Sequence, residues 1–154
     1  MTNNELLGKI RYIFNFKDEQ MQDLFALGEL EASKEEIVNW LRKEDHEDFV
    51  ALTDRQLACF LNGWIIKNRG KKEGKSPVPE LVLDNNQRLR KIKIALTLQQ
   101  DDMLHIFKKS GRNVSKSELT SFFRNSFHHN YMPCKDQYFR AFVQGLQKVY
   151  RPVH

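Results

Sequence analysis

The feature that most constrains how this 154-residue chain can fold is an internal duplication. Residues 3–69 align with residues 85–151 without a gap, and sixteen of the 67 aligned positions are identical. Conservative replacements such as Trp40/Phe122 keep the apolar positions in phase between the identities. Two tandem copies of one small structural unit are therefore predicted. The identical pairs are Asn3/Asn85, Asn4/Asn86, Leu7/Leu89, Lys9/Lys91, Ile10/Ile92, Met21/Met103, Phe25/Phe107, Ser33/Ser115, Lys34/Lys116, Glu36/Glu118, Arg42/Arg124, His46/His128, Asp54/Asp136, Phe60/Phe142, Gly63/Gly145 and Arg69/Arg151.

Hydrophobic periodicity predicts four helices in each copy. The first helix follows from an apolar face that includes Leu6, Ile10 and Ile13, at the spacing of one side of an α-helix. A capping box, Ser-x-x-Glu, begins the third helix of both copies, at Ser33 and Ser115. No run of residues alternates with period two, so no β-sheet is expected. The predicted fold is all-α, with two tandem homologous four-helix repeats and about eight helices in total.

Residues with particular backbone preferences mark the helix ends and the boundary between the copies. Asn3 or Asn4 is expected to cap the first helix, because a short side-chain oxygen accepts free backbone N–H groups. Gly28 is expected to end the second helix in a left-handed conformation. A segment rich in glycine, proline and lysine, RGKKEGKSPVPE, separates the copies. We therefore divide the chain into a first repeat at 1–66, a linker at 67–83 and a second repeat at 84–154.

Charge is distributed unevenly over these parts. The net charge of +5 arises from 25 basic and 20 acidic residues. Residues 3–66 carry a net charge of −6, whereas residues 67–76 carry +4 and residues 77–154 carry +7. A polyanion is therefore expected to contact the basic second repeat rather than the acidic first repeat. The opposite charges also predict an attraction between the repeats that would occupy part of the basic surface.

A helix-turn-helix layout is the most specific binding signal in the sequence. A short helix, a turn and a capped helix follow one another at 18–43 and again in the second copy, and in DNA-binding proteins the second helix of this motif enters the major groove. Two packed helices of an ordinary bundle have the same layout, and the turn here is slightly longer than in the strict motif. In the second copy the side chains offered to a nucleic acid would be Lys108, Lys109, Arg112, Asn113, Lys116 and Arg124.

The expected first helix of the second copy is also basic. Arg90 and Lys93 share part of one helix face, and Arg88 and Lys91 share another. Charges in this arrangement are typical of a solvated helix surface, which is how we interpret them.

Residue types that commonly carry chemistry are present without the spacing that the chemistry needs. His128 and His129 are adjacent and would diverge on a helix, whereas metal ligands commonly lie three or four residues apart. Cys59 is interpreted as a small core residue, and Cys134 precedes a helix, where the helix dipole is expected to lower the pKa of the thiol. Walker A, GxGxxG, GxSxG and HExxH sequences are absent. We expect no catalytic, metal or cofactor site and no enzymatic activity.

Composition also bears on the compartment. No stretch is apolar and long enough to be a membrane span, and the first residues lack the basic and then apolar pattern of a signal peptide. Two cysteines are too few for a disulfide scaffold. We expect a cytoplasmic protein that has no membrane partner.

Four strings in the sequence resemble the YehS-like bacterial proteins. They are IRYIF near residue 10, WLRKED at 40–45, FLNG at 60–63 and DNNQRLRKIKIAL at 84–96. The resemblance extends from Asn3 to about Arg151 and includes the duplication. It implies a cytoplasmic protein built from two copies of a small domain of unknown function, and it brings no catalytic motif.

Two functional hypotheses follow. The first is a non-enzymatic interaction protein that binds a protein partner through a groove between the repeats or through an exposed aromatic such as Phe127 or Tyr131. The alternative is nucleic-acid binding through the helix-turn-helix-like unit of the basic second repeat, with the linker lysines adding phosphate contacts.

Overall fold

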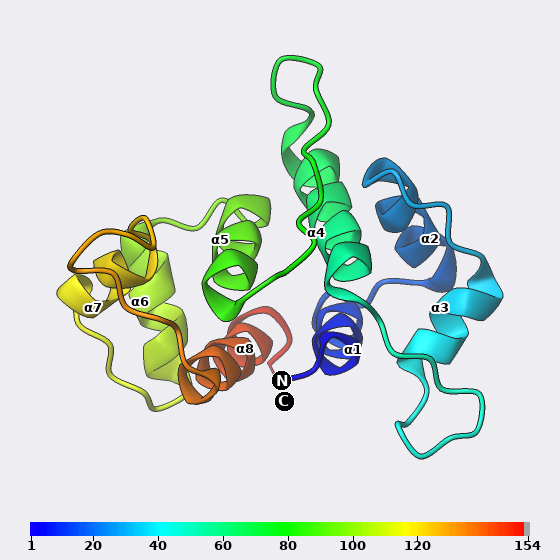
Figure 1. Ribbon diagram of the computed structural model, residues 1–154. Helices are drawn as coiled ribbons and strands as arrows, with labels where there is room; N and C mark the ends of the chain where they lie inside the picture. Colours follow the sequence, from blue (N-terminus) through cyan, green and yellow to red (C-terminus); the bar gives the residue numbers. More distant parts are fainter. Residues whose placement is uncertain (153–154) are drawn as a thin grey trace. The chain divides into compact units, whose positions relative to one another are not determined.

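A computed structural model of the chain describes residues 1–152. Within those residues it contains eight α-helices and no β-strand, which confirms the predicted all-α class with two four-helix repeats (Figure 1). An isolated antiparallel bridge joins Lys72 to Lys75 in the tight turn between the repeats. The helices are α1 (Asn3–Phe14), α2 (Asp18–Leu27), α3 (Lys34–Leu41), α4 (Asp54–Arg69), α5 (Asn85–Ala95), α6 (Gln100–Lys109), α7 (Lys116–Phe122) and α8 (Asp136–Tyr150).

The chain divides into two compact units, of which the first is Met1–Leu83 and the second begins at Asp84. In each unit the second helix packs most extensively on the fourth, α2 on α4 and α6 on α8. Helix α4 continues to Arg69, so residues 67–69 of the expected linker are helical. Residues 153–154 of the expected second repeat lie outside the described residues. No helix in the described part of the chain is long and apolar enough to cross a membrane.

Aromatic side chains fill the equivalent core positions of the two units. In the first unit the ring of Phe25 lies 5.2 Å from that of Trp40 and 5.1 Å from that of Phe60. In the second unit Phe107 and Phe142, which align with Phe25 and Phe60, lie 5.3 Å apart. All these distances are centroid separations at which tilted aromatic pairs attract beyond their buried area. The aligned apolar positions therefore build the same core twice.

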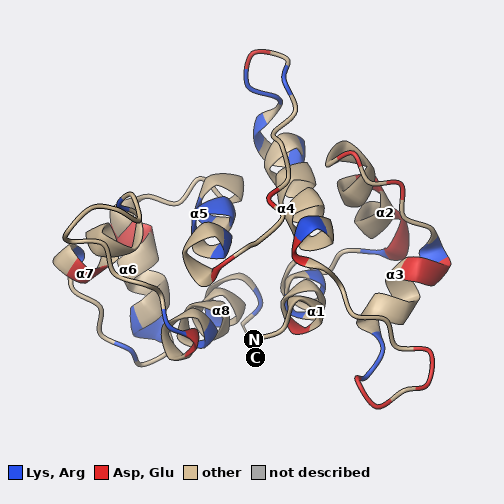
Figure 2. Ribbon diagram, in the orientation of Figure 1, with Lys and Arg blue, Asp and Glu red and all other residues tan. Residues whose placement is uncertain are grey.

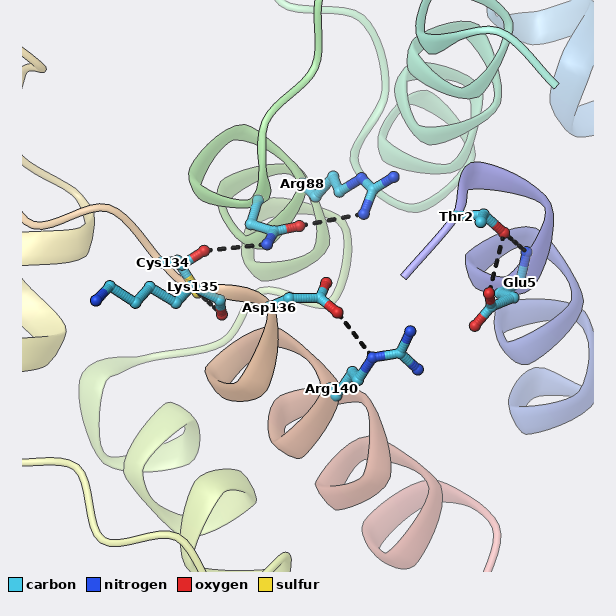
Figure 3. Close-up of polar contacts among 8 residues, drawn as sticks. Thr2, Glu5, Arg88, Cys134, Lys135, Asp136 and Arg140 are labelled. Carbon is cyan, nitrogen blue, oxygen red and sulfur yellow. Dashed lines mark hydrogen bonds and ion pairs between the residues drawn. The ribbon is translucent and has the colours of Figure 1, made fainter. Parts of the chain in front are cut away.

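Side chains cap the third helix of both repeats as predicted, and the first helix departs from expectation. The capping boxes at Ser33–Glu36 and Ser115–Glu118 are present as predicted. The prediction that Asn3 or Asn4 caps α1 is wrong, because both residues lie inside the helix and Thr2 accepts the backbone N–H of Glu5 at 3.1 Å (Figure 3).

Glycines permit the helices of each pair to touch at the backbone. A Cβ atom on Gly63 of α4 would lie 1.7 Å from the carbonyl oxygen of Leu24 in α2, and one on Gly145 of α8 would lie 2.0 Å from that of Ile106 in α6. Gly28 is the C-cap of α2, which confirms that it ends the helix, but the predicted left-handed conformation is wrong, because its φ is −83° and Glu29 has the positive φ of 67°. Gly28 instead allows a close approach, since a Cβ there would meet the carbonyl oxygen of Cys59 at 1.8 Å.

The asparagine pair that opens each repeat ties the first helix to the loop before the fourth helix. Asn86 donates through Nδ2 to the carbonyl oxygens of Phe122 and Met132 at 3.0 and 2.9 Å, and its Oδ1 accepts the N–H of Cys134 at 2.8 Å. Asn4 makes the three corresponding bonds in the first unit, at 2.9, 2.9 and 3.0 Å. These asparagines therefore hold two equivalent loops, residues 42–53 after α3 and residues 123–135 after α7.

Candidate functional site

Two of the six residues proposed from sequence for nucleic-acid contact line a hollow in the second unit. Lys108 and Lys109 are the last two residues of α6, and Asn113 lies exposed in the loop that follows. The guanidinium of Arg112 lies over the ring of Tyr138, 4.7 Å from its centroid. Lys116 and Arg124, by contrast, line one hollow beside α7. The structure therefore brings Lys116 and Arg124 together, and the other four residues do not line this hollow.

Two neighbouring hollows in the second unit form the candidate functional site, and we call them the α7 hollows. They have volumes of about 360 and 390 Å³ and share Thr120 and Arg124. Neither has an aspartate or glutamate among its lining residues, and together they contain four cationic side chains. The first is lined by Lys116, Ser117, Thr120, Ser121, Arg124 and Asn130, and the second by Arg90, Lys93, Ile94, Gln100, Leu119, Thr120, Phe123 and Arg124.

The basic stretch of α5 supplies two of the four cations, which sequence reasoning treated as a solvated surface. Arg90 and Lys93 both lie over the ring of Phe123, 5.9 and 5.7 Å from its centroid, and Arg90 donates to the Phe123 carbonyl oxygen at 2.7 Å. Arg88, on the other face of α5, is buried over the ring of Phe139 at 5.5 Å. Arg90 and Lys93 share one face, as predicted, and both line the second hollow. The interpretation of these charges as a solvated surface is wrong for Arg88, which is buried.

Substitutions between the repeats remove carboxylates from the second unit. In the first unit Arg11 forms an ion pair with Asp18 at 2.7 Å. The aligned residues of the second unit are Lys93 and Gln100. The carboxylate that neutralises Arg11 in the first unit is therefore replaced by a neutral amide beside Lys93 in the alignment. Acidic positions also lie along the loop after α3 (Figure 2). Its residues Glu44, Asp45, Glu47 and Asp48 align with Ser126, Phe127, His129 and Asn130 of the second unit.

The loops after α3 and α7 follow the same path and each carries an arginine–histidine pair. The Nδ1 atoms of His46 and His128 each accept a backbone N–H, from Asp48 and Asn130, at 3.0 Å. Arg42 and Arg124 approach these rings through Nη1, at 3.4 and 3.5 Å from Nε2. Sequence reasoning noted that His46 aligns with His128 but assigned the pair no contact with arginine.

The histidines do not behave as the sequence led us to expect. His128 and His129 lie in the loop after α7 rather than on a helix, and their rings stack with centroids 4.6 Å apart instead of diverging. Among residues 1–152 no group of three or more histidine, cysteine, aspartate or glutamate side chains is placed to hold a metal ion.

The expectation that a helix dipole lowers the pKa of Cys134 is wrong. Cys134 is buried just before Lys135 and Asp136 at the start of α8 (Figure 3). Burial raises the pKa of the thiol to about 12, and the carboxylates of Asp84 and Asp136 act in the same direction by disfavouring a second negative charge. Cys134 is therefore held as a neutral thiol, and Cys59 is buried in the core as predicted.

We expect Cys134 to resist modification in the folded protein. In a Cys59→Ala variant, where Cys134 is the remaining cysteine, Ellman's reagent should titrate almost no thiol at neutral pH and one thiol per chain after denaturation. Alanine is the residue that the second repeat has at the position of Cys59, so the variant is expected to fold. Rapid reaction of the native variant would show that the thiol is neither buried nor neutral.

Sequence reasoning missed the residues that shape the α7 hollows without carrying charge. Thr120 and Ser121 lie on the outer side of α7, and their hydroxyls donate to the carbonyl oxygens of Lys116 and Ser117 at 2.9 Å. Phe123 and Asn130 come from the following loop. These residues could have been found by comparing the repeats, because they differ from the aligned residues of the first repeat: Asn130 aligns with Asp48, and Ser121 aligns with Asn39.

Comparison with known proteins agrees with this arrangement of two repeats. The family model described as "Protein of unknown function (DUF1456)" matches residues 3–70 and again residues 85–151. The chain is 40% identical over 147 residues to the uncharacterized protein YehS of Escherichia coli (strain K12), which covers 95% of this chain and 94% of that protein. No solved structure matches the chain. Because the family model covers both repeats and the similarity to YehS extends over most of both chains, the chain belongs to the DUF1456 family of proteins of unknown function, as the resemblance in its sequence indicated.

Proposed function

We propose that this protein is a binding module rather than an enzyme, and that its second unit binds nucleic acid through the α7 hollows. The observation that carries the proposal is the set of four cations, Arg90, Lys93, Lys116 and Arg124, which line two adjoining hollows that have no carboxylate among their lining residues. Contacts between such cations and phosphates release counterions and supply most of the affinity for nucleic acid. Threonine, serine and asparagine side chains between them are further groups that bind phosphate and sugar oxygens.

An exposed aromatic in the loop between Arg124 and Asn130 supports the same proposal. Phe127, in the loop after α7, is 96% exposed. An exposed aromatic ring beside a basic surface offers a stacking platform for unpaired bases. Phe127 also supports a second candidate function, in which the ring inserts into a pocket of a protein partner. That candidate takes precedence if the purified chain binds neither DNA nor RNA.

We expect binding of short fluorescent DNA and RNA to weaken steeply with salt. If the four cations each contact a phosphate of a duplex, affinity should fall about a hundredfold between about 50 and 200 mM salt. Fluorescence anisotropy titrations of the full chain at several salt concentrations measure the slope. Single-stranded and double-stranded probes should be compared, because stacking on Phe127 favours unpaired bases.

The repeats supply a matched control for this measurement. The double reversal Lys116→Glu with Arg124→Glu should lower affinity by about tenfold or more and reduce the salt dependence by about two phosphate contacts. Lys34 and Arg42 occupy the aligned positions of the first unit, so their reversal tests the same chemistry outside the α7 hollows. The proposal would be contradicted if the two double variants lowered the affinity equally, or if the affinity did not change with salt concentration.

A further inference from the structure

In the arginine–histidine pair of each loop, the two groups that face each other are both hydrogen-bond donors. A neutral imidazole has one N–H donor and one acceptor nitrogen, and the bond made by one nitrogen determines the role of the other. Because Nδ1 of His46 and of His128 accepts a backbone N–H, the proton is assigned to Nε2 in both rings. Each Nε2–H faces Nη1 of an arginine, which carries only donors. At 3.4 and 3.5 Å two donors therefore face each other in both units.

The second unit lacks an acceptor that the first unit supplies. In the first unit Nε of Arg42 donates to Oδ1 of Asn39 at 2.9 Å. Ser121 replaces this asparagine in the second unit, and its hydroxyl donates to the Ser117 carbonyl oxygen instead. Nε of Arg124 is shielded from solvent and has no hydrogen-bond partner within the described residues. A buried donor left without an acceptor is costly, so the Arg124 side chain lacks the stabilising bond that holds Arg42 in the first unit.

The charges around the two pairs distinguish them further. The loop of the first unit carries Glu44, Asp45, Glu47 and Asp48, whose carboxylates repel an anion. The aligned residues of the second unit are Ser126, Phe127, His129 and Asn130, none of which is acidic. Lys116 lines the same hollow as Arg124, together with hydroxyl groups from α7. In the second unit, therefore, Arg124 and His128 present hydrogen-bond donors to each other, and Lys116 adds positive charge in the same hollow as Arg124.

We propose that Arg124 and His128, with Lys116, form a binding site for a phosphate group. The oxygens of a tetrahedral oxyanion would accept from Arg124 and from Nε2 of His128. Lys116 would contribute a third hydrogen-bond donor and a second positive charge. The site goes beyond the nucleic-acid interface, because the chemistry recognises a phosphate group whether it is free or part of a polymer. The aligned pair in the first unit keeps the geometry, but its acidic loop makes it a poor anion site.

Titration with inorganic phosphate tests this site directly. In ¹⁵N-labelled full-length protein, phosphate added at ionic strength held constant with chloride should shift the Asn130 amide and the ring and guanidinium nitrogens of His128 and Arg124. Arg124→Gln should weaken phosphate binding by about tenfold or more, because it removes a charged donor. The control Arg42→Gln should change the phosphate affinity less than about twofold.

A second pair of variants separates loss of a donor from loss of the fold. In His128→Asn the side-chain oxygen can still accept the N–H of Asn130 at the place of Nδ1, but the Nε2 donor is gone. This variant should keep the unfolding transition of the parent protein and lose phosphate affinity, whereas His46→Asn should keep both. Two-bond ¹H–¹⁵N spectra of the neutral rings should show the proton on Nε2 of His128. A proton on Nδ1 would overturn the proposal.

The outcomes also distinguish this site from the proposed nucleic-acid interface. Phosphate binding that depends on Arg124, without binding of DNA or RNA, supports the site and points to a small phosphorylated ligand. Binding of nucleic acid with no response to phosphate, or with a response unchanged in Arg124→Gln, overturns the phosphate site and leaves the interface of the α7 hollows to stand on its own salt dependence. Absence of any response to phosphate overturns the phosphate site in either case.

Discussion

Replacing Gly63 or Gly145 by alanine is expected to lower the free energy of unfolding by about 3 kcal/mol, at the upper end of the usual cost of overpacking. A Cβ at these positions would lie 1.7 Å from the carbonyl oxygen of Leu24 or 2.0 Å from that of Ile106. The clashing atoms belong to the backbone of the facing helix, so no side-chain rotation relieves the overlap. The pairs α2–α4 and α6–α8 would have to separate, and these pairs make the most extensive helix contacts of each unit.

Chemical denaturation followed by two signals measures this effect in each unit. Both tryptophans of the chain, Trp40 and Trp64, lie in the first unit, so tryptophan fluorescence should report Gly63→Ala and circular dichroism should report Gly145→Ala. Gly8→Ala is the control: it lies within α1, and its new Cβ would meet only Leu41 at 4.0 Å. This change should stabilise the protein by about 0.5–1 kcal/mol. Equal effects of all three substitutions would show that the helices do not touch at these glycines.

The fold was predictable because its determinants are local and occur twice. The spacing of Leu6, Ile10 and Ile13 indicates one helix face, and all three side chains are buried in α1. The capping boxes at Ser33 and Ser115 act within a single turn of helix. Duplication strengthened each of these signals, because the same pattern is present in both copies.

Contacts between distant segments were not predictable in the same way. Gly28 ends α2 as the sequence predicted, but the requirement for a glycine there comes from the backbone of Cys59 in another helix. Asn3 and Asn4 resemble capping residues, and the identity of both with Asn85 and Asn86 marked them as important. Their partners lie 36 to 51 residues away along the chain, so only the tertiary structure reveals them. An asparagine at the start of a predicted helix has the same sequence pattern whether it caps the helix or binds a distant loop.

The sequence predicted the positive charge of the candidate site and the repeat that carries it, but only some of its residues. Counting charge directed attention to the second repeat, where the α7 hollows lie. Arg112 followed the same charge argument, yet it lies over Tyr138 and lines neither of these two hollows. Arg90 and Lys93 line one of them, because α5 and Phe123 are close in space although they are far apart in the sequence. The missing information was therefore which basic segments converge.

Replacing Asn86 by alanine is expected to destabilise the second unit by about 3 kcal/mol and to weaken ligand binding at the α7 hollows. Asn86 is 8% exposed, and its removal leaves the carbonyl oxygens of Phe122 and Met132 and the N–H of Cys134 without their partner. Buried polar groups left unpaired each cost about 1–3 kcal/mol, less what water restores. The loop that carries Arg124 and His128 would lose the two hydrogen bonds that Asn86 of α5 makes at Met132 and Cys134, so binding should fall with stability.

The first unit and the exposed surface provide the comparisons for Asn86→Ala. Asn4→Ala removes the same three bonds but leaves a less buried site, so its cost should be smaller and should appear in the tryptophan fluorescence of the first unit. Asn113→Ala, at an exposed position, should change the free energy of unfolding by less than about 0.5 kcal/mol. Denaturant titrations by circular dichroism measure all three. If Asn86→Ala is as stable as Asn113→Ala, the hydrogen bonds of Asn86 have no part in holding the loop after α7 or in positioning Arg124 and His128.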